Sequence, residues 1–153
     1  MGKIILPHSL NLDSVSTDVW RHVVWGTPAH GVFGRLSCAI RLFLDFYRAG
    51  ISTRIYLGNG SYISDDGRSE SEFTRDYALE NLHQIFGFEG GHLRDKLQGS
   101  IFVESIFGQN TRGEIEGCFE QCARMDDVDH LILVTSPFHA PRSYRDALAL
   151  REE

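Results

Sequence analysis

The sequence has no apolar stretch of the length that a membrane span requires. A transmembrane helix needs roughly 18 or more consecutive apolar residues, whereas the N-terminal run Ile4–Leu6 is interrupted at once by Pro7. That run is also too short for the apolar part of a secretory signal. We therefore expect a cytoplasmic protein without a membrane partner.

Basic residues are also scarce, with 15 Lys and Arg against 21 Asp and Glu and a formal net charge of -6. Proteins that bind the nucleic-acid backbone usually carry a basic stripe. The charge balance therefore disfavours a nucleic-acid partner. It leaves room for local positive charge that holds one small anion.

Cysteines and closely spaced histidines are few. The three cysteines are an odd number without a secretory context, so we expect reduced thiols. Cys118 and Cys122 share an apolar helical stripe with Ile115, which favours core packing over metal binding. No two of the seven histidines are close in sequence, and zinc generally takes three or four ligands. We expect no metal, and we expect the histidines other than His139 to be structural or solvent-facing.

What is present is an alternation of apolar strand-like segments with helical patterns. Four such segments stand out: Val19–Trp25, Thr53–Leu57, Ser100–Glu104 and Leu131–Thr135. A short strand at Ile4–Leu6 has weaker support. Alternating strands and helices indicate a mostly parallel sheet covered on both faces. We predict one α/β domain over residues 1–153, a Rossmann-like three-layer α/β/α sandwich with four or five strands.

Helix starts are marked by two candidate capping boxes, Ser69 with Glu72 and Thr111 with Glu114. The predicted helix at 34–49 is apolar over most of its circumference, so it is buried on more than one side. It either lies deep in the domain or forms a subunit contact, which makes a homodimer one candidate assembly. The segment Gly58–Arg68 is expected to be a mobile surface loop beside the site.

The most informative segment is the last strand together with the residues after it. Polar residues come directly after the apolar run: Thr135, Ser136, His139 and Arg142. Ser136 followed by proline suits a helix N-cap, so we expect His139 in the first helical turn. Ligands in parallel sheets bind beyond the carboxyl ends of the strands, and helix N-termini attract anions. His139 is the candidate general acid or base and Arg142 the candidate anion ligand; an ordinary cap with a surface histidine and a solvated arginine is the alternative.

Other strand ends carry further candidates. Gly26 and Thr27 come at the end of the expected first strand, and Arg35 begins the next helix. This loop is not GxGxxG, so it carries no dinucleotide fingerprint, and a plain strand-to-helix turn is the alternative. Glu104 ends the third strand and is the second catalytic candidate, to orient a hydroxyl, accept a proton or pair with Arg142. A purely structural ion pair is the competing interpretation.

With these residues placed, the chain resembles the YdcF/SanA/ElyC-like domain family over roughly residues 18–148. The most specific element is the pattern VTSxxHxxR ending at Arg142, coupled to an upstream Glu104 and then Asn110 and Thr111. The other matching pieces are Gly26-Thr27, Arg35-Leu36, the run Tyr56-Leu57-Gly58-Asn59-Gly60, and the helix expected from Ser69 to Gly87.

The resemblance implies a Rossmann-like domain with its polar residues gathered at one sheet edge. It does not imply a particular reaction, because the family has no settled one. It implies a small anionic or nucleotide-like ligand, with S-adenosylmethionine or a nucleotide as candidate cofactors. On this basis Gly58, Asn59 and Gly60 join the ligand-binding candidates. Asn110 and Thr111 are helix-capping residues that also face the site in this interpretation.

Together these residues predict a metal-independent hydrolase or group transferase acting on a phosphorylated or nucleotide-like metabolite. The alternative is a non-catalytic module that binds a nucleotide or S-adenosylmethionine. Both interpretations require the separate strand ends to meet in one crevice, with His139 close to Glu104.

Overall fold

The computed structural model describes residues 1–10, 12, 15–88 and 91–152. Its centre is a four-stranded sheet in the order β5-β4-β1-β6, in which every neighbouring pair is parallel. The strands are β1 (Gly2–Pro7), β4 (Ser52–Leu57), β5 (Ile101–Val103) and β6 (Val128–Val134). The predicted α/β class and Rossmann-like three-layer arrangement are confirmed.

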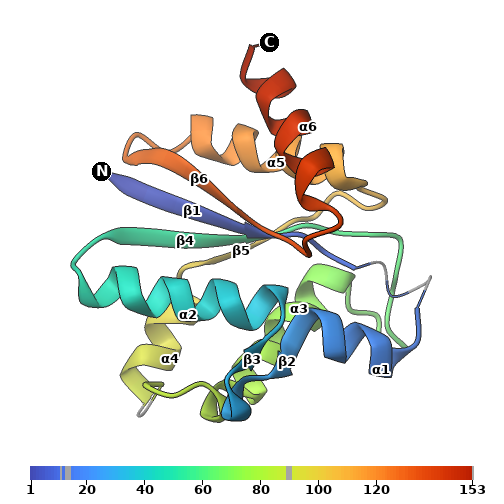
Figure 1. The fold of residues 1–153 in the computed structure, drawn as a ribbon, viewed down its shortest axis with the longest axis vertical. Coiled ribbons are helices and arrows are strands. Elements are labelled where there is room, and N and C mark those ends of the chain that lie inside the picture. The colour runs from blue at the N-terminus through green and yellow to red at the C-terminus, as the bar shows by residue number, and fades with distance from the viewer. Residues whose placement is uncertain (11, 13–14, 89–90, 153) are drawn as a thin grey trace.

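Helices cover both faces of this sheet. Figure 1 shows α5 (Thr111–Ala123) and α6 (Ala140–Glu152) on one face. The other face carries α1 (Thr17–Trp20), α2 (Arg35–Arg48), α3 (Glu70–Glu80) and α4 (Gly91–Gln98). Short elements complete the chain: a π-helical turn at Arg21–Trp25, 3₁₀ turns at Pro28–His30 and Leu82–Gln84, and a hairpin of β2 (Gly26–Thr27) with β3 (Val32–Phe33).

The sheet divides the apolar core into two parts because successive strand residues point to opposite faces. In β1, Ile5 belongs to the core shared with α2, whereas Ile4 and Leu6 belong to the core shared with α5. All three are fully buried. A strand that is covered on both faces is a continuous apolar run rather than an alternating one.

The prediction of a first strand at Val19–Trp25 is wrong. These residues form α1 and the π-helical turn, and Ser16 caps α1 by accepting a hydrogen bond from Val19 N. Trp20 and Val24 are buried while Val19 is 48% exposed, which is the pattern of a helix with one face on the core. The true first strand is β1, over the segment with the weaker sequence support.

The capping box predicted at Ser69 and Glu72 is present at the start of α3. The two other predicted helix starts are shifted. For α5 the N-cap is Asn110, which accepts from Gly113 N, and Thr111 is already helical. The last helix begins at Ala140, and His139 O accepts from Ser143 N, so Ser136 is not its cap.

The helix predicted at 34–49 is α2, and it packs against β1, β4 and β6. Its buried apolar side chains belong to the core shared with β1 and β4, and Leu42 and Phe46 pack against the same core while half-buried. The helix therefore lies against the centre of the domain. Its use as a subunit contact stays a prediction.

The assignment of the first strand can be tested by stability. Ile5→Ala in β1 should lower the free energy of unfolding by about 2–5 kcal/mol, because it leaves a cavity at a fully buried site. Val19→Ala should change it by about 0.5 kcal/mol or less, because that side chain is largely exposed. Urea unfolding of the two variants measures both values, and equal losses would contradict the assignment.

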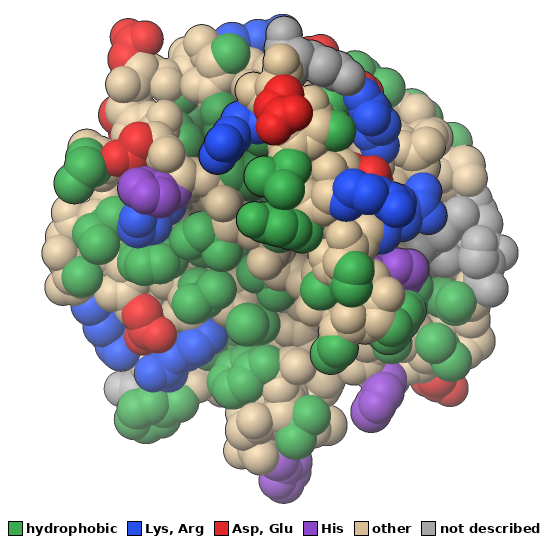
Figure 2. All heavy atoms as spheres, turned by 45° about the horizontal axis from the view of Figure 1, so that its top comes forward, with side chains coloured by type: hydrophobic (Ala, Val, Ile, Leu, Met, Phe, Trp, Pro, Cys, Tyr) green, Lys and Arg blue, Asp and Glu red, His purple; other side chains and the backbone are tan. Residues whose placement is uncertain are grey.

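The surface of the molecule carries charges of both signs. Figure 2 shows acidic and basic side chains interspersed over the face that it views, without one continuous basic stripe. None of the helices in the described part of the chain has the length and apolar character to cross a membrane. The absence of a nucleic-acid partner stays a prediction.

Candidate functional site

The strand order places a topological switch point between β1 and the outer strand β6. From β1 the chain adds β4 and then β5 on one side, and it returns to add β6 on the other side of β1. Ligands of open parallel sheets bind in the crevice beyond the carboxyl ends of the strands at such a point. Here the residues after β1 are His8 and Ser9, and the residues after β6 begin with Thr135.

A cavity of about 160 Å³ lies at this point. Its lining comes from the ends of β1 and β6 and from the starts of α2, α5 and α6: His8, Ser9, Leu10, Arg35, Thr111, Thr135, His139 and Ser143. The structure thus brings Arg35, Thr111, Thr135 and His139 together, as predicted. It adds His8, Ser9 and Ser143.

Four of these lining residues have a buried polar atom without a hydrogen-bond partner among the described residues. The atoms are His8 Nε2, Arg35 Nη2, Thr135 Oγ1 and Ser143 Oγ. The side chains of His8, Arg35 and Ser143 are only 4%, 5% and 1% exposed. Buried polar atoms are normally paired, because an unpaired one costs about 1–3 kcal/mol. A polar ligand in this cavity would satisfy donors and acceptors that the protein itself leaves open.

His8 is held by a buried carboxylate. Its Nδ1 lies 2.7 Å from Oε2 of Glu114, whose side chain is also buried in the first turn of α5. Because a carboxylate only accepts, Nδ1 carries the proton and donates it. In the neutral imidazole this leaves a lone pair on Nε2, a buried atom that has no hydrogen-bond partner among the described residues. Ser9 fixes Glu114 from the other side, since its N–H and hydroxyl both donate to Glu114 Oε1.

Arg35 brings a buried positive charge to the same cavity. Its Nε donates to Ser136 Oγ at 3.0 Å, and its Nη1 donates to the carbonyl oxygens of His8 and Ser9 at 3.3 and 3.0 Å. Burial lowers the pKa of Arg35, and attraction to Glu114 opposes that shift. The guanidinium remains charged at neutral pH. Ser136, expected as a helix cap, thus positions Arg35 instead.

His139 is half-buried at the start of α6 and lines the cavity. Burial lowers its pKa, and the charges of Arg35, His8 and Arg142 lower it further. A bound anion would act in the opposite direction, because negative charge favours the imidazolium.

This balance gives a pH-linked prediction. Sulfate keeps two negative charges from pH 5 to 8, so its binding should raise the pKa of His139 from the lowered value of the free protein. Sulfate should therefore bind more tightly as the pH falls, with uptake of up to one proton per site. NMR titration of the His139 ring with and without sulfate measures the shift. His30 lies outside the cavity, and its resonances should not respond; an unchanged His139 titration would refute the anion contact.

Glu104 and His139 line different cavities, so the prediction that they lie close together in one crevice is wrong. Glu104 comes after β5 and His139 after β6, which are the two outer strands of the sheet. With strands about 4.8 Å apart, their ends are separated by roughly 14 Å. Glu104 lines a different cavity, together with Ser69 and Phe107. The sequence shows that both residues end strands, but not that β4 and β1 lie between them.

Glu104 is instead a structural carboxylate, and both of its oxygens accept hydrogen bonds from the protein. It accepts hydrogen bonds from the Tyr56 hydroxyl and from the N–H groups of Ser105 and Ile106, the last two at 2.8 and 3.1 Å. Burial would raise the pKa of Glu104, but these hydrogen bonds lower it below its usual value. Tyr56 also accepts from Gln109 Nε2 at 3.3 Å. The group therefore positions the loop that leads into α5.

The loop after β4 is buried at its start, which differs from the mobile surface loop expected there. Gly58, Asn59 and Gly60 are all buried. Asn59 is fixed through hydrogen bonds to Ser71 N and to the carbonyl of Glu104. Gly60 lines the cavity that adjoins the site, and Gly58 lines a smaller one that shares His8 and Ser9 with the site.

Gly58 lies against the carboxylate that holds His8. A Cβ atom there would lie 2.6 Å from Glu114 Cγ and 2.9 Å from its Oε1. Gly58→Ala should therefore displace Glu114 and lower the free energy of unfolding by about 1–3 kcal/mol. Urea unfolding measures this loss. Gly99→Ala is the matched control, since its nearest neighbour would be at an ordinary 3.5 Å; equal behaviour of the two variants would contradict the prediction.

The remaining predicted ligand residues separate into two groups. Gly26 and Thr27 form β2 of the small hairpin, and they line neither the switch-point cavity nor the one beside it. Asn110, Thr111 and Arg142 line that adjoining cavity, which has a volume of about 360 Å³. Arg142 is 57% exposed and lies 3.7 Å from Asp146, so the predicted pair with Glu104 is not formed.

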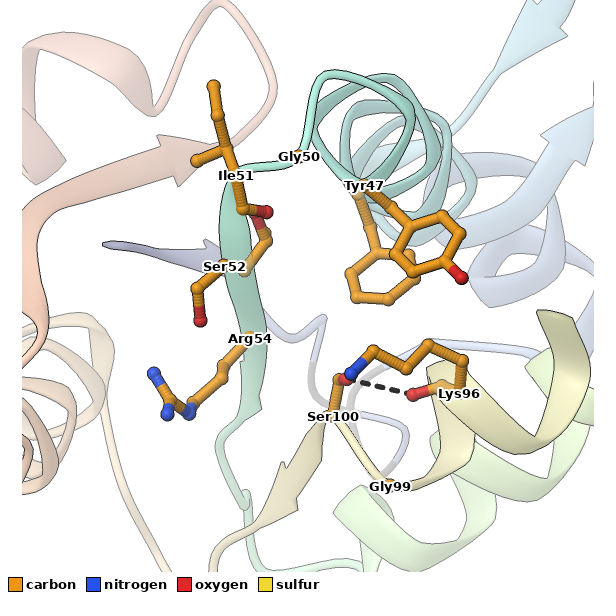
Figure 3. Close-up of a pocket in the computed structure, with 10 residues that line it drawn as sticks. Tyr47, Gly50, Ile51, Ser52, Arg54, Lys96, Gly99 and Ser100 are labelled. Atoms are coloured by element: carbon orange, nitrogen blue, oxygen red, sulfur yellow. Dashed lines mark hydrogen bonds between the residues drawn. The ribbon is translucent and has the colours of Figure 1, made fainter. Parts of the chain in front are cut away.

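A larger cavity, of about 420 Å³, lies at the opposite end of the strands (Figure 3). Arg54 extends away from Tyr47 and Lys96 in this view, and it pairs with Asp127 at 3.1 Å. Ser100 donates to the carbonyl of Lys96. None of the four unpartnered atoms of the switch-point cavity belongs to this larger cavity. The smaller cavity at the switch point is therefore the better candidate site.

His8 and Glu114 are the functional candidates that sequence reasoning missed. His8 was expected to be structural or solvent-facing, yet it comes directly after Pro7 at the end of the central strand. If Ile4–Leu6 is taken as a strand, His8 becomes a candidate, because ligands bind beyond the carboxyl ends of parallel strands. Glu114 was interpreted only as part of a capping box, and no local signal shows that it faces the sheet.

Comparisons of this chain with protein-family models, with curated proteins and with solved structures found no match. The resemblance to the YdcF/SanA/ElyC-like family stays a prediction based on the sequence pattern.

Proposed function

We propose that this protein is a hydrolase or group transferase that acts on a phosphorylated metabolite in the cavity between the ends of β1 and β6. The observation that carries the proposal is the set of four unpartnered buried polar atoms around that cavity. A phosphoryl group has several oxygen acceptors, which match the open donors of a guanidinium and hydroxyls. The family resemblance supports the same ligand class.

In this proposal Arg35 holds the phosphoryl oxygens. Its buried guanidinium keeps Nη2 unpartnered in the described structure, while its other nitrogens fix its orientation. A preorganised charge in a buried site stabilises negative charge in the transition state without reorganisation. Arg35 thus takes the part that a metal ion plays in many phosphoryl-transfer sites.

His8 is the proposed general base. Glu114 holds Nδ1–H, so Nε2 can take the proton of a water molecule, or of an acceptor hydroxyl, as its oxygen attacks phosphorus. The bond from phosphorus to the leaving oxygen breaks, and His139 as imidazolium gives that oxygen a proton. The phosphoryl group itself favours the imidazolium of His139, whose pKa is low in the free protein. The pair His8–Glu114 thus takes the place of the expected pair His139–Glu104.

The test is release of inorganic phosphate from a panel of phosphomonoesters, in the presence of EDTA. We expect turnover that persists in EDTA and thermal stabilisation by inorganic phosphate. A ligand at 100 times its dissociation constant should stabilise the fold by about 2.7 kcal/mol. Stabilisation without turnover of any ester would favour the non-catalytic binding module instead. If phosphate neither stabilises the fold nor is released, both functions fail.

We also propose a cytoplasmic location. Cys38, Cys118 and Cys122 are free thiols in the structure, which suits a reducing compartment.

A further inference from the structure

The cavity that adjoins the proposed phosphate site extends it by about 360 Å³. Ser9 and Thr111 line both cavities. Glu114 of the second cavity bonds His8 of the first at 2.7 Å. A ligand with its phosphoryl group against Arg35 can therefore continue into the second cavity past the pair that we propose as the base.

The second cavity is lined by polar side chains and glycines. Its residues are Ser9, Gly60, Ser61, Gly108, Gln109, Asn110, Thr111, Glu114 and Arg142. Among the described residues it contains no aliphatic or aromatic side chain. Pockets for drug-like ligands are mostly apolar, and bases are commonly held by stacking on aromatic rings. This lining offers hydrogen bonds to hydroxyl groups, and among the described residues it has no aromatic ring on which a base could stack.

The aromatic residues nearest in sequence do not supply that surface. Phe107 lines the separate cavity of Glu104. Phe138 lies against the ring of His139, with centroids 4.4 Å apart, and it lines neither part of the site.

The polar groups of the second cavity are well positioned. Gln109 is fixed, since it accepts from Asn59 N at 3.0 Å and donates to Gly113 O at 3.2 Å. Asn110 is anchored as the N-cap of α5. Arg142 lies 3.7 Å from Asp146, too far for a hydrogen bond, so its donors remain available to a ligand on that side.

From this lining we infer that the substrate is a sugar phosphate or a related phosphorylated polyol, and not a nucleotide or S-adenosylmethionine. The inference rests on the proposed function, because it needs the phosphoryl group in the first cavity. The hydroxylated carbon skeleton then lies in the second cavity, against Asn110, Thr111 and Arg142.

Calorimetric titration with four probes tests this inference: inorganic phosphate, ribose 5-phosphate, AMP and S-adenosylmethionine. Ribose 5-phosphate and AMP share the phosphorylated ribose and differ in the base. We expect ribose 5-phosphate to bind about tenfold more tightly than phosphate, as one or two added hydrogen bonds allow, and no less tightly than AMP. AMP that binds tenfold more tightly than ribose 5-phosphate, or specific binding of S-adenosylmethionine, would overturn the inference.

A variant locates the effect in the second cavity. Asn110→Ser keeps a residue that caps helices well but removes the amide. Its affinity for ribose 5-phosphate should fall toward that for inorganic phosphate, which should itself be unchanged. Equal loss of both ligands would overturn the division into two cavities.

The substrate class and the proposed function fail differently. Wild-type protein that does not bind inorganic phosphate contradicts the proposed function itself. Wild-type protein that binds phosphate but holds ribose 5-phosphate no more tightly contradicts only the substrate class.

Discussion

Arg35→Met should weaken the binding of inorganic phosphate by about 100-fold or more. The variant removes the buried charge and the open Nη2 donor, and hydrogen bonds to charged groups are worth about 1.5–3 kcal/mol each. Arg35→Lys should give an intermediate loss, because it keeps the charge but not the planar fork of donors. Calorimetry measures the dissociation constants.

The Arg35 result needs a folding control, because this side chain also bonds Ser136 and the carbonyls after β1. Near-UV circular dichroism of both variants should retain the native signal for the comparison to hold. Arg54→Met is the matched control, since Arg54 lines the larger cavity of Figure 3 and should leave phosphate affinity unchanged. A folded Arg35→Met protein with wild-type affinity would rule out the guanidinium as the anion ligand.

The second large effect is expected at His8. His8→Asn keeps a donor in place of Nδ1–H for Glu114 but removes Nε2. We expect kcat/KM for phosphomonoester hydrolysis to fall by about 10²–10⁴, the usual contribution of a general base. The dissociation constant for phosphate should change by only a few-fold, because Arg35 remains.

Glu114→Gln provides an independent check of this assignment. The glutamine amide can donate to Nδ1, which would place the proton on Nε2 and block its action as a base. Both variants should therefore lose kcat more than affinity. His83→Asn, at an exposed histidine, is the control and should be fully active. Full activity of His8→Asn would refute the role of His8.

Much of the architecture could be predicted from local patterns. The apolar run that ends in Thr135 and Ser136 is β6 and its turn, and Arg35 does begin a helix beside the site. These signals are local, because strand ends and helix starts depend on a few neighbouring residues. The strand end before Thr135 therefore led to Thr135 and His139, which line one cavity. Arg35 lines the same cavity, although the strand predicted before it is helical.

The wrong predictions concern features that depend on contacts between segments far apart in the sequence. Ile4–Leu6 is a short run, and it becomes the central strand because β4 and β6 pair with it on both sides. Val19–Trp25 is rich in strand-forming residues, yet helix capping at Ser16 and burial of one face make it helical. The predicted proximity of Glu104 and His139 is wrong for the same reason, because the order of strands in the sheet depends on segments that are far apart in the sequence.

The central claim is that an oxyanion binds between the ends of β1 and β6, against Arg35 and His8. A crystal soaked in tungstate, a phosphate analogue with strong anomalous scattering, tests it most directly. We predict an anomalous peak in this cavity, within hydrogen-bond distance of Arg35 Nη2. A peak in the cavity of Arg54 and Lys96 instead, or no peak at the switch point, would contradict this claim.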